Sequence, residues 1–456
     1  MADLKNIHRI YFLGIGGIGM SALARYFRFH GKMVSGFDKT ETELTKTLEK
    51  EGIPVSYQDD PALLPKDVQL VVYTPAIPKD NRSLNFYRNN GYDLMKRSEV
   101  LGLITADMKN ICVAGTHGKT TISTMIAHIL RDSGLGSNAF LGGISTNYNT
   151  NFWSQGNDVC VVEADEYDRS FLRLHPDIAV ISSMDADHLD IYGNGDAVQQ
   201  AFIEFSKKIK SGGTLVQKHG LSIPKPGEDI QRLSYHLTDR SADVYSKNLR
   251  INEGNYVFDV DGSEGHMKDV RLNIGGRHNV ENALAAITAC RQLGLAGDKI
   301  IPALRNFRGV RRRFEYHVLG QGPVYLDDYA HHPRELEALI GSTRELFPER
   351  KLLVIFQPHL YSRTKDFAKE FAETLDGADE VILLPIYPAR ELPIQGISSA
   401  TILEKMDKAR ARIKSKTEVL DLAKKVKPGD QTVWITAGAG DIDELVKPLT
   451  QILENK

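Results

Sequence analysis

Residues 111–121 have the types and order of a phosphate-binding turn. An apolar run ends at a glycine, a Gly-Lys pair follows, and two threonines open a run with helical spacing. Glycines let backbone N–H groups approach an anion, and a helix start adds its dipole. A lysine brings positive charge to the outer phosphates, and a threonine hydroxyl reaches a magnesium ion. The positions concerned are Gly115, Thr116, Gly118, Lys119, Thr120 and Thr121.

This turn is shorter than the usual pattern. Thr116 and His117 alone separate the two glycines, whereas the full motif has four residues there. The alternative is an ordinary strand-to-helix turn with a surface lysine. Two adjacent threonines directly after Gly-Lys favour the phosphate-binding interpretation.

Two acid-rich segments follow predicted strands. Four acids stand in residues 163–168 after the strand 158–163, and Asp-Ala-Asp-His-Leu-Asp at 185–190 follows the strand 178–183. Buried acids are costly unless they meet cations, and a hard cation takes oxygen ligands with an occasional imidazole. A charge run is usually a solvated face. Because both segments stand at strand ends, a magnesium site is favoured.

The N-terminal region predicts a dinucleotide-type fold. A complete G-x-G-x-x-G at 14–19 follows the strand 8–13, and the next strand, 33–37, ends at Asp38. The glycines and the start of the helix suit a diphosphate, and the acid suits the hydroxyl groups of a ribose. The same geometry could bind any ligand that contains a diphosphate. The strand 68–73 ends at Thr74, either in a ligand contact or in a plain proline turn. The motif glycines are Gly14, Gly16, Gly17 and Gly19.

Further polar groups lie toward the C-terminus. Asn279 and Asn282 share one face of a predicted helix start, where they read a base or, as spacing alone favours, cap the helix. Three arginines at 311–313 form an anion clamp or a solvated hinge. Beyond them, polar clusters stand at the ends of the strands 324–326, 352–356, 381–384 and 433–436.

These motifs require three consecutive α/β domains. With 456 residues, the chain is too long to fold around a single hydrophobic core. We expect an N-terminal Rossmann-like domain, a central P-loop ATPase-like parallel sheet with a β-rich excursion at 212–275, and a C-terminal Rossmann-like domain. The predicted boundaries are 1–106, 107–310 and 311–456.

Composition limits the functional classes. Hydrophobic residues make up 41% and charged residues 25%, and the net charge of -2 favours neither nucleic acid nor an anionic membrane. No apolar run has the length of a membrane span. The three cysteines, Cys112, Cys160 and Cys290, stand in apolar contexts typical of buried thiols in a reducing compartment. We therefore expect a cytoplasmic protein.

The residues alone describe phosphoryl transfer from a nucleoside triphosphate. A second nucleotide-binding fold favours an ATP-dependent ligase that activates a carboxylate on a nucleotide-linked substrate. The alternatives are an NAD-dependent oxidoreductase, which leaves the Gly-Lys-Thr turn unexplained, and a P-loop switch or motor, which leaves the N-terminal glycines unexplained.

The combined motifs resemble the Mur ligases over essentially the whole chain. The relevant segments are 115–121, 163–168, 187–188, 278–282, 312–314 and 327–333, together with 14–19, Asp38 and 357–364. The resemblance implies ATP, UDP-N-acetylmuramate and L-alanine as substrates and an acyl-phosphate intermediate, in peptidoglycan precursor synthesis. A related ligase that recycles murein tripeptide is the closest rival, and segments 167–172 and 190–192 favour alanine. A folate-type polyglutamate ligase would not need the N-terminal glycines.

The resemblance also implies residue roles. The UDP-sugar site would comprise Gly14, Gly16, Gly17, Gly19, Asp38 and Thr74. The ATP site would comprise residues 115, 116 and 118–121 with Asn279, Asn282 and Arg313, which moves the asparagines from capping to the adenine side. One magnesium would bind Thr120 and Glu163, and a second His188. Catalysis would use Lys119, His188, Arg313 and Asp328, and L-alanine would meet His331, His359 and Arg363.

One departure concerns the second metal. Several Mur ligases carry a carbamoylated lysine past the metal histidine, whereas residues 199–203 of this chain read Gln-Gln-Ala-Phe-Ile. The resemblance leaves monomer and dimer open.

Overall fold

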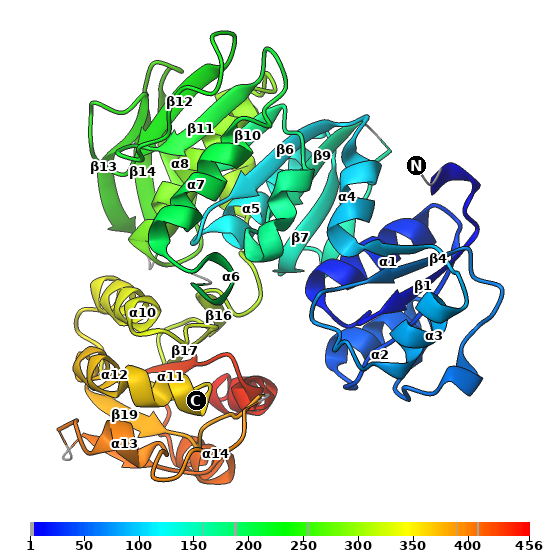
Figure 1. The fold of residues 1–456 in the computed structure, drawn as a ribbon. Helices are drawn as coiled ribbons and strands as arrows, with labels where there is room; N and C mark the ends of the chain where they lie inside the picture. The colour runs from blue at the N-terminus through cyan, green and yellow to red at the C-terminus, as the bar shows by residue number, and fades with distance from the viewer. Residues whose placement is uncertain (1–3, 157, 187–188, 253–254, 390, 408–409) are drawn as a thin grey trace. The chain divides into compact units, whose positions relative to one another are not determined.

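The computed structural model describes residues 4–156, 158–186, 189–252, 255–389, 391–407 and 410–456. Contacts divide the chain into two compact units, and Figure 1 labels the helices and strands along the chain. The first contains Met1–Lys247, Asp259–Val270 and Glu281–Asn306, and the second contains Asn248–Phe258, Arg271–Val280 and Phe307–Lys456. None of the described helices is long and apolar enough to cross a membrane.

The N-terminal sheet is parallel with the order β3-β2-β1-β4-β5. Its order reverses at β1, and ligands of such sheets bind at the carboxyl ends of strands beside that point. The strands are β1 (Arg9–Leu13), β2 (Met33–Phe37), β3 (Val55–Ser56), β4 (Leu70–Tyr73) and β5 (Leu94–Lys96). The helices are η1 (Leu4–Asn6), α1 (Ile18–Phe29), α2 (Glu43–Lys50), η2 (Pro61–Leu63), α3 (Arg82–Asn89) and α4 (Arg97–Thr105).

The central sheet has the order β15-β14-β13-β12-β11-β10-β6-β9-β7-β8. The β-rich segment predicted at 212–275 continues this sheet rather than leaving it. The strands are β6 (Lys109–Ala114), β7 (Asn138–Ser145), β8 (Thr150–Trp153), β9 (Val159–Glu163), β10 (Ile178–Ile181), β11 (Thr214–Lys218), β12 (Gln231–His236), β13 (Val244–Asn252), β14 (Asn255–Gly262) and β15 (Met267–Leu272). The helices are α5 (Lys119–Asp132), η3 (Tyr167–Arg173), α6 (Leu189–Tyr192), α7 (Gly195–Ser206), α8 (Arg277–Arg291) and α9 (Gly297–Asn306).

The C-terminal sheet has the order β16-β17-β21-β18-β19-β20; β16 pairs antiparallel with β17, and the other described pairs are parallel. Its strands are β16 (Glu315–Val318), β17 (Val324–Asp328), β18 (Leu352–Phe356), β19 (Glu380–Leu383), β20 (Ala411–Ile413) and β21 (Val433–Ala437). Its helices are α10 (Pro333–Leu346), α11 (Tyr361–Asp366), α12 (Ala368–Leu375), α13 (Ala400–Leu403), α14 (Lys416–Lys424), η4 (Asp441–Leu445) and α15 (Val446–Leu453). The predicted three-domain α/β class is confirmed.

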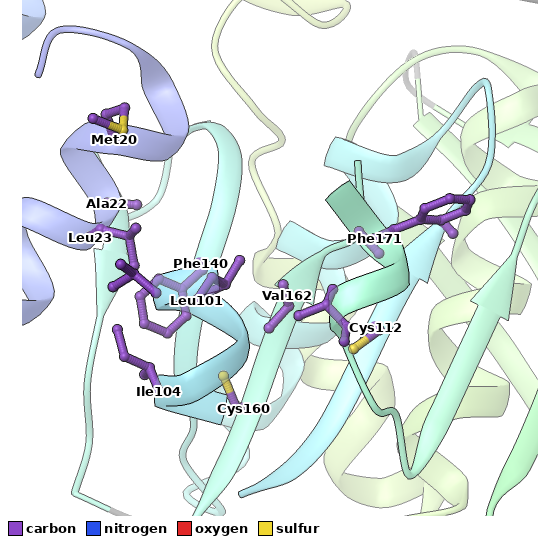
Figure 2. Packing of buried hydrophobic residues seen from close by; sticks show 14 of the residues in the cluster. Met20, Ala22, Leu23, Leu101, Ile104, Cys112, Phe140, Cys160, Val162 and Phe171 are labelled. Carbon is purple, nitrogen blue, oxygen red and sulfur yellow. The ribbon is translucent and has the colours of Figure 1, made fainter. Parts of the chain in front are cut away.

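Helix α1 joins the first two sheets into one core. The apolar residues Met20, Leu23, Ala24 and Phe27 of α1 are buried, and α1 packs against β7 and β8. Figure 2 shows Met20 and Leu23 of α1 in the same cluster as Phe140 of β7 and Cys160 of β9. All three cysteines are buried, as predicted, and burial raises their thiol pKa values.

A buried arginine lies at this junction. The Arg25 guanidinium contacts both carboxylate oxygens of Glu51, at 2.7 and 2.9 Å, and the Oδ1 atom of Asn151. Asn151 is fully buried and donates to the Ile18 carbonyl. Arg25 therefore connects helix α1 and the end of α2, both in the N-terminal domain, to strand β8 of the central sheet.

Replacing Arg25 with methionine should keep the aliphatic packing but leave Glu51 and Asn151 without their donor. We expect R25M to lower the free energy of unfolding by about 2 kcal/mol, because Glu51 remains partly solvated. Urea unfolding followed by circular dichroism measures the change. The matched control is R28M, one turn along α1 and exposed, expected within about 0.5 kcal/mol of wild type. Equal effects of the two changes would contradict the assigned role of Arg25.

Candidate active site

The turn after β6 leaves no room for a side chain at either of its two glycines, Gly115 and Gly118. A Cβ on Gly115, which has φ +135°, would lie 2.2 Å from Ser182 Oγ. A Cβ on Gly118, with φ +84°, would lie 2.9 Å from Asn282 Oδ1. Gly118 is the left-handed residue before α5 begins at Lys119. The local geometry is that of a tight anion-binding turn at a helix start.

Lys119 is held inside this turn by two oxygen atoms. Its Nζ atom donates to the Gly115 carbonyl at 2.7 Å and to Glu166 Oε1 at 2.8 Å. The Glu166 side chain is 1% exposed and that of Lys119 15%. The ammonium group is therefore held between the turn and the acidic segment that follows β9.

Thr120 and Glu163 form an oxygen pair beside the lysine. Thr120 Oγ1 donates to Glu163 Oε1 at 3.1 Å, and the Gly142 N–H donates to Oε2 at 3.0 Å. Burial raises the pKa of Glu163, and nearby Lys119 opposes that shift. A carboxylate and a hydroxyl are ligands suited to Mg²⁺, which keeps several waters and binds substrate phosphates. The pair therefore fits one magnesium ion.

The second acidic segment supports the turn from β10. Thr116 Oγ1 donates to Ser183 Oγ at 2.9 Å, the His117 N–H donates to the same atom at 2.8 Å, and Asp185 N–H donates to Thr116 Oγ1 at 3.2 Å. The predicted metal ligand His188 lies outside the described residues. Among the side chains that the structure describes, no group of three His, Cys, Asp or Glu residues is arranged for a metal.

The first acidic segment meets protein cations, as the cost of buried charge requires. Besides the Lys119–Glu166 pair, Lys96 Nζ lies 3.4 Å from Asp168 and Arg97 Nη2 lies 3.8 Å from Asp165. The Arg97 guanidinium also lies 3.0 Å from the Cβ position of Gly19. Arg97 therefore stands between the N-terminal glycine motif and the acidic turn.

The N-terminal motif residues come together at the end of β1. The Gly16 N–H donates to Asp38 Oδ2 at 2.8 Å, and the Gly14 N–H donates to the Phe37 carbonyl at 2.8 Å. A Cβ on Gly14 would lie 3.0 Å from Thr74 Cγ2. Gly17 directly precedes α1. The glycine motif, Asp38 and Thr74 therefore lie together at the carboxyl ends of the strands of the N-terminal sheet, where the strand order reverses.

The two asparagines have different surroundings. Asn282 Oδ1 lies against Gly118 of the phosphate-binding turn. Asn279 is buried, and its Nδ2 donates to the Gly275 carbonyl at 2.6 Å. The Asn279 contact is a local bond at the start of α8 in which the side chain donates, whereas a helix cap accepts a backbone N–H, so the capping interpretation also stays a prediction. The adenine role of both residues stays a prediction.

A buried ion pair anchors the arginine segment in the C-terminal domain. Arg312 Nε lies 3.1 Å from Asp327 Oδ2, and Nη2 donates to the Gly438 carbonyl at 2.5 Å. Arg312 has φ +59°, an unusual conformation for a non-glycine residue. Burial raises the pKa of Asp327 to about 7, although Arg312 opposes the shift.

Asp328 and Arg313 flank this pair. Asp328 accepts the N–H groups of Phe314 and Ala330, each at 2.7 Å, so its carboxylate fixes the backbone on either side. Burial raises the pKa of Asp328, and Arg313 opposes that shift. The Arg313 guanidinium lies 5.4 Å from the ring centre of Tyr329. The catalytic roles of Arg313 and Asp328 stay predictions.

The three residues predicted for the amino acid lie near one another. The rings of His331 and His359 are 6.0 Å apart, and His359 stacks on Tyr387. Burial is the main cause that lowers the pKa of His331, with Arg363 among the further causes. Arg363 Nη1 is buried with no hydrogen-bond partner among the described residues. An unpartnered guanidinium nitrogen suits a carboxylate ligand.

Sequence reasoning missed several of these contacts. Glu166 and Arg97 received no role, and Ser182, Ser183 and Asp327 were not singled out. Glu166 stood inside a segment already recognised as acidic, so its position gave a partial signal. The partner of each of these residues is distant in the sequence, and no local pattern identifies it.

Three family descriptions cover nearly the whole chain. "Mur ligase family, catalytic domain" matches residues 9–109, "Mur ligase middle domain" matches 113–290, and "Mur ligase, glutamate ligase domain" matches 312–440.

Individual proteins match over their full lengths. The UDP-N-acetylmuramate–L-alanine ligase of Flavobacterium johnsoniae is 48% identical, covering 99% of both chains, and that of Cytophaga hutchinsonii is 47% identical, covering 100% and 98%. The solved UDP-N-acetylmuramate–alanine ligase of Thermotoga maritima matches with a TM-score of 0.83 at 29% identity, covering 97% and 98%. A murein peptide ligase of Psychrobacter arcticus shares the fold, with a TM-score of 0.66 at 23% identity, covering 98% and 99%.

The raised pKa of Asp327 predicts a pH-dependent stability. An acid whose pKa rises from 3.8 to about 7 on folding favours the folded state fully below pH 3.8 and loses that contribution as the pH rises to about 7. In D327N this group no longer titrates. Between pH 5 and pH 8, wild type should therefore lose stability relative to D327N in urea unfolding. A constant or opposite difference would contradict the burial argument.

Proposed function

This chain belongs to the Mur ligase family, and we propose that it joins L-alanine to the carboxylate of UDP-N-acetylmuramate with ATP as the energy source. The observation that carries the proposal is the Lys119–Thr120–Glu163 arrangement in a chain 48% identical, end to end, to a ligase of that name. Such a reaction supplies a precursor of peptidoglycan, and its nucleotide substrates favour the cytoplasm.

The ATP site would be built on the glycine turn. Gly115 and Gly118 allow backbone N–H groups to approach the phosphates, and Lys119 would neutralise the transferred one. Thr120 and Glu163 would hold one Mg²⁺ ion, and His188 a second one. Bound magnesium would supply charge neutralisation and orientation of the phosphate oxygens. Asn279, Asn282, Arg313 and Asp328 would complete this site.

The nucleotide sugar would occupy the edge of the N-terminal sheet. The support is the approach of Gly14 and Gly16 to Asp38 and Thr74 at the switch point. The glycine loop would lie at the diphosphate, and Asp38 would accept from the ribose hydroxyls.

The amino acid would bind in the C-terminal domain. The buried Arg363 Nη1 atom would pair with the carboxylate of L-alanine. His331 follows β17 and His359 follows β18, the strands on either side of β21, and their rings are 6.0 Å apart. The lowered pKa of His331 favours a neutral imidazole, which can accept a proton.

Two steps would give the product. A carboxylate oxygen of the sugar attacks the γ-phosphorus, the bond to the bridging oxygen breaks, and ADP leaves. The neutral amine of alanine then attacks the acyl carbon, the carbon–oxygen bond breaks, phosphate leaves with that oxygen, and the amine proton passes to a base, a role open to neutral His331. Positioning and charge neutralisation, rather than covalent catalysis, would lower the barrier.

An acceptor screen tests the function directly. Phosphate release should require ATP, magnesium, UDP-N-acetylmuramate and L-alanine together. Omission of any one gives the background rate. Activity with murein tripeptide but not with L-alanine would support the recycling ligase instead. Oxidation of NADH with a keto acid would support the oxidoreductase alternative.

Arg363→Leu tests the amino acid site. Loss of a charge-assisted pair with the alanine carboxylate should raise the KM for L-alanine by roughly 10- to 100-fold. The KM values for ATP and the nucleotide sugar should stay near wild type in the same coupled assay. Arg334→Leu, at the start of α10, is the exposed control. An unchanged KM for L-alanine in R363L would refute the assignment.

A further inference from the structure

We propose that Glu166 is a positioning residue that holds Lys119 while the ATP site is empty and releases it to the outer phosphates of ATP. The inference rests on the proposed function, in which the turn at 115–118 binds ATP. Glu166 lies on the segment that follows β9, three residues beyond the predicted magnesium ligand Glu163.

The environment of Lys119 requires a partner. Its side chain is 15% exposed, and a largely buried ammonium group is costly without a counter-charge. The contact at 2.8 Å with Glu166 supplies that charge, and the Gly115 carbonyl accepts a second hydrogen bond from Nζ at 2.7 Å. Both contacts draw the ammonium group onto protein oxygens. An outer phosphate must therefore compete with Glu166 for Lys119.

Glu166 itself is held from the backbone. Tyr192 Oη donates to the Glu166 carbonyl at 2.6 Å, and the Arg169 N–H donates to the same oxygen at 3.0 Å. The Arg169 guanidinium lies 5.2 Å from the ring centre of Tyr192, and Tyr192 is 7% exposed. Asp168 and Arg169 both have left-handed φ values, 52° and 54°, within this turn. The turn is thus constrained at several points.

The two partners therefore differ in mobility. Lysine has a flexible four-carbon stem, whereas the backbone of Glu166 is fixed by these bonds. We infer that Lys119 moves between the carboxylate and the phosphate, while Glu166 stays in place. After ADP and phosphate form, return of Lys119 to Glu166 would assist their release.

The competition has a measurable consequence for binding. When only a fraction of the free protein has Lys119 available, the apparent affinity for ATP falls by that fraction. Removal of the Glu166 charge should free the lysine and strengthen binding. If about one molecule in ten has the lysine free, the gain is about tenfold.

The test is the substitution Glu166→Gln, which keeps the shape and an acceptor oxygen but removes the charge. Isothermal titration calorimetry with MgATP, without sugar or alanine, measures binding separately from turnover. We expect the Kd of E166Q for MgATP to be about tenfold lower than that of wild type. The KM for ATP should fall in parallel, while the KM values for the sugar and alanine stay unchanged.

Several outcomes would overturn the proposal. Unchanged or weaker MgATP binding by E166Q, with wild type binding normally, would mean that Glu166 acts in the loaded site, for example near the metal. That result leaves the proposed function intact. Absence of MgATP binding by wild type would overturn both the function and this inference.

Two further variants serve as controls. Glu166→Asp retracts the carboxylate by one methylene group and should lower the Kd by a few-fold, between wild type and E166Q; it also provides the test if E166Q fails to fold. Asp177 pairs with Lys210 at 2.9 Å just before β10. This pair lies at the amino ends of the strands, whereas the turn at 115–118 lies at their carboxyl ends. D177N breaks an ion pair of similar length and should leave MgATP binding unchanged. If D177N changed the Kd for MgATP as much as E166Q does, the effect of E166Q would come from a general loss of structural order, and the proposal would be wrong.

Discussion

The contact between Lys119 and Glu166 is the interaction around which the central domain is arranged. It places opposite charges at the carboxyl ends of β6 and β9, neighbouring parallel strands. Because Gly115 has no side chain, the Ser182 hydroxyl can lie against the turn that carries the lysine. The turn, the acidic segment and the end of β10 therefore depend on one another.

The other two domains use the same physical arrangement with different ligand chemistry. At the end of β1, the Gly16 N–H donates to one acid, Asp38, and no lysine takes part in that contact. In the C-terminal domain, the Arg312–Asp327 pair fixes the backbone that carries Arg313. Each domain thus presents polar groups where parallel strands end and where backbone groups are available to a ligand. A ligase with three different substrates suits this repetition.

Local patterns were enough to predict much of this organisation. The strand at 33–37 was predicted from its place after the glycine motif, and the turn at 115–121 follows from the placement of glycine and lysine. The β-rich segment was recognised, but its continuation of the central sheet was not, because strand pairing is set by contacts distant in sequence. The same limit explains why Glu166 and Asp327 were overlooked: their partners are identified by the fold.

In the proposed reaction, the γ-phosphate of ATP bound at the turn of residues 115–121 is transferred to the carboxylate of the nucleotide sugar and so activates it. The most direct measurement is turnover of UDP-N-acetylmuramate labelled with ¹⁸O in its carboxylate, with ATP and L-alanine, followed by mass spectrometry of the released phosphate. An acyl-phosphate route predicts that each phosphate carries one oxygen from the carboxylate. Unlabelled phosphate, formed at the same rate as the amide product, would contradict the account.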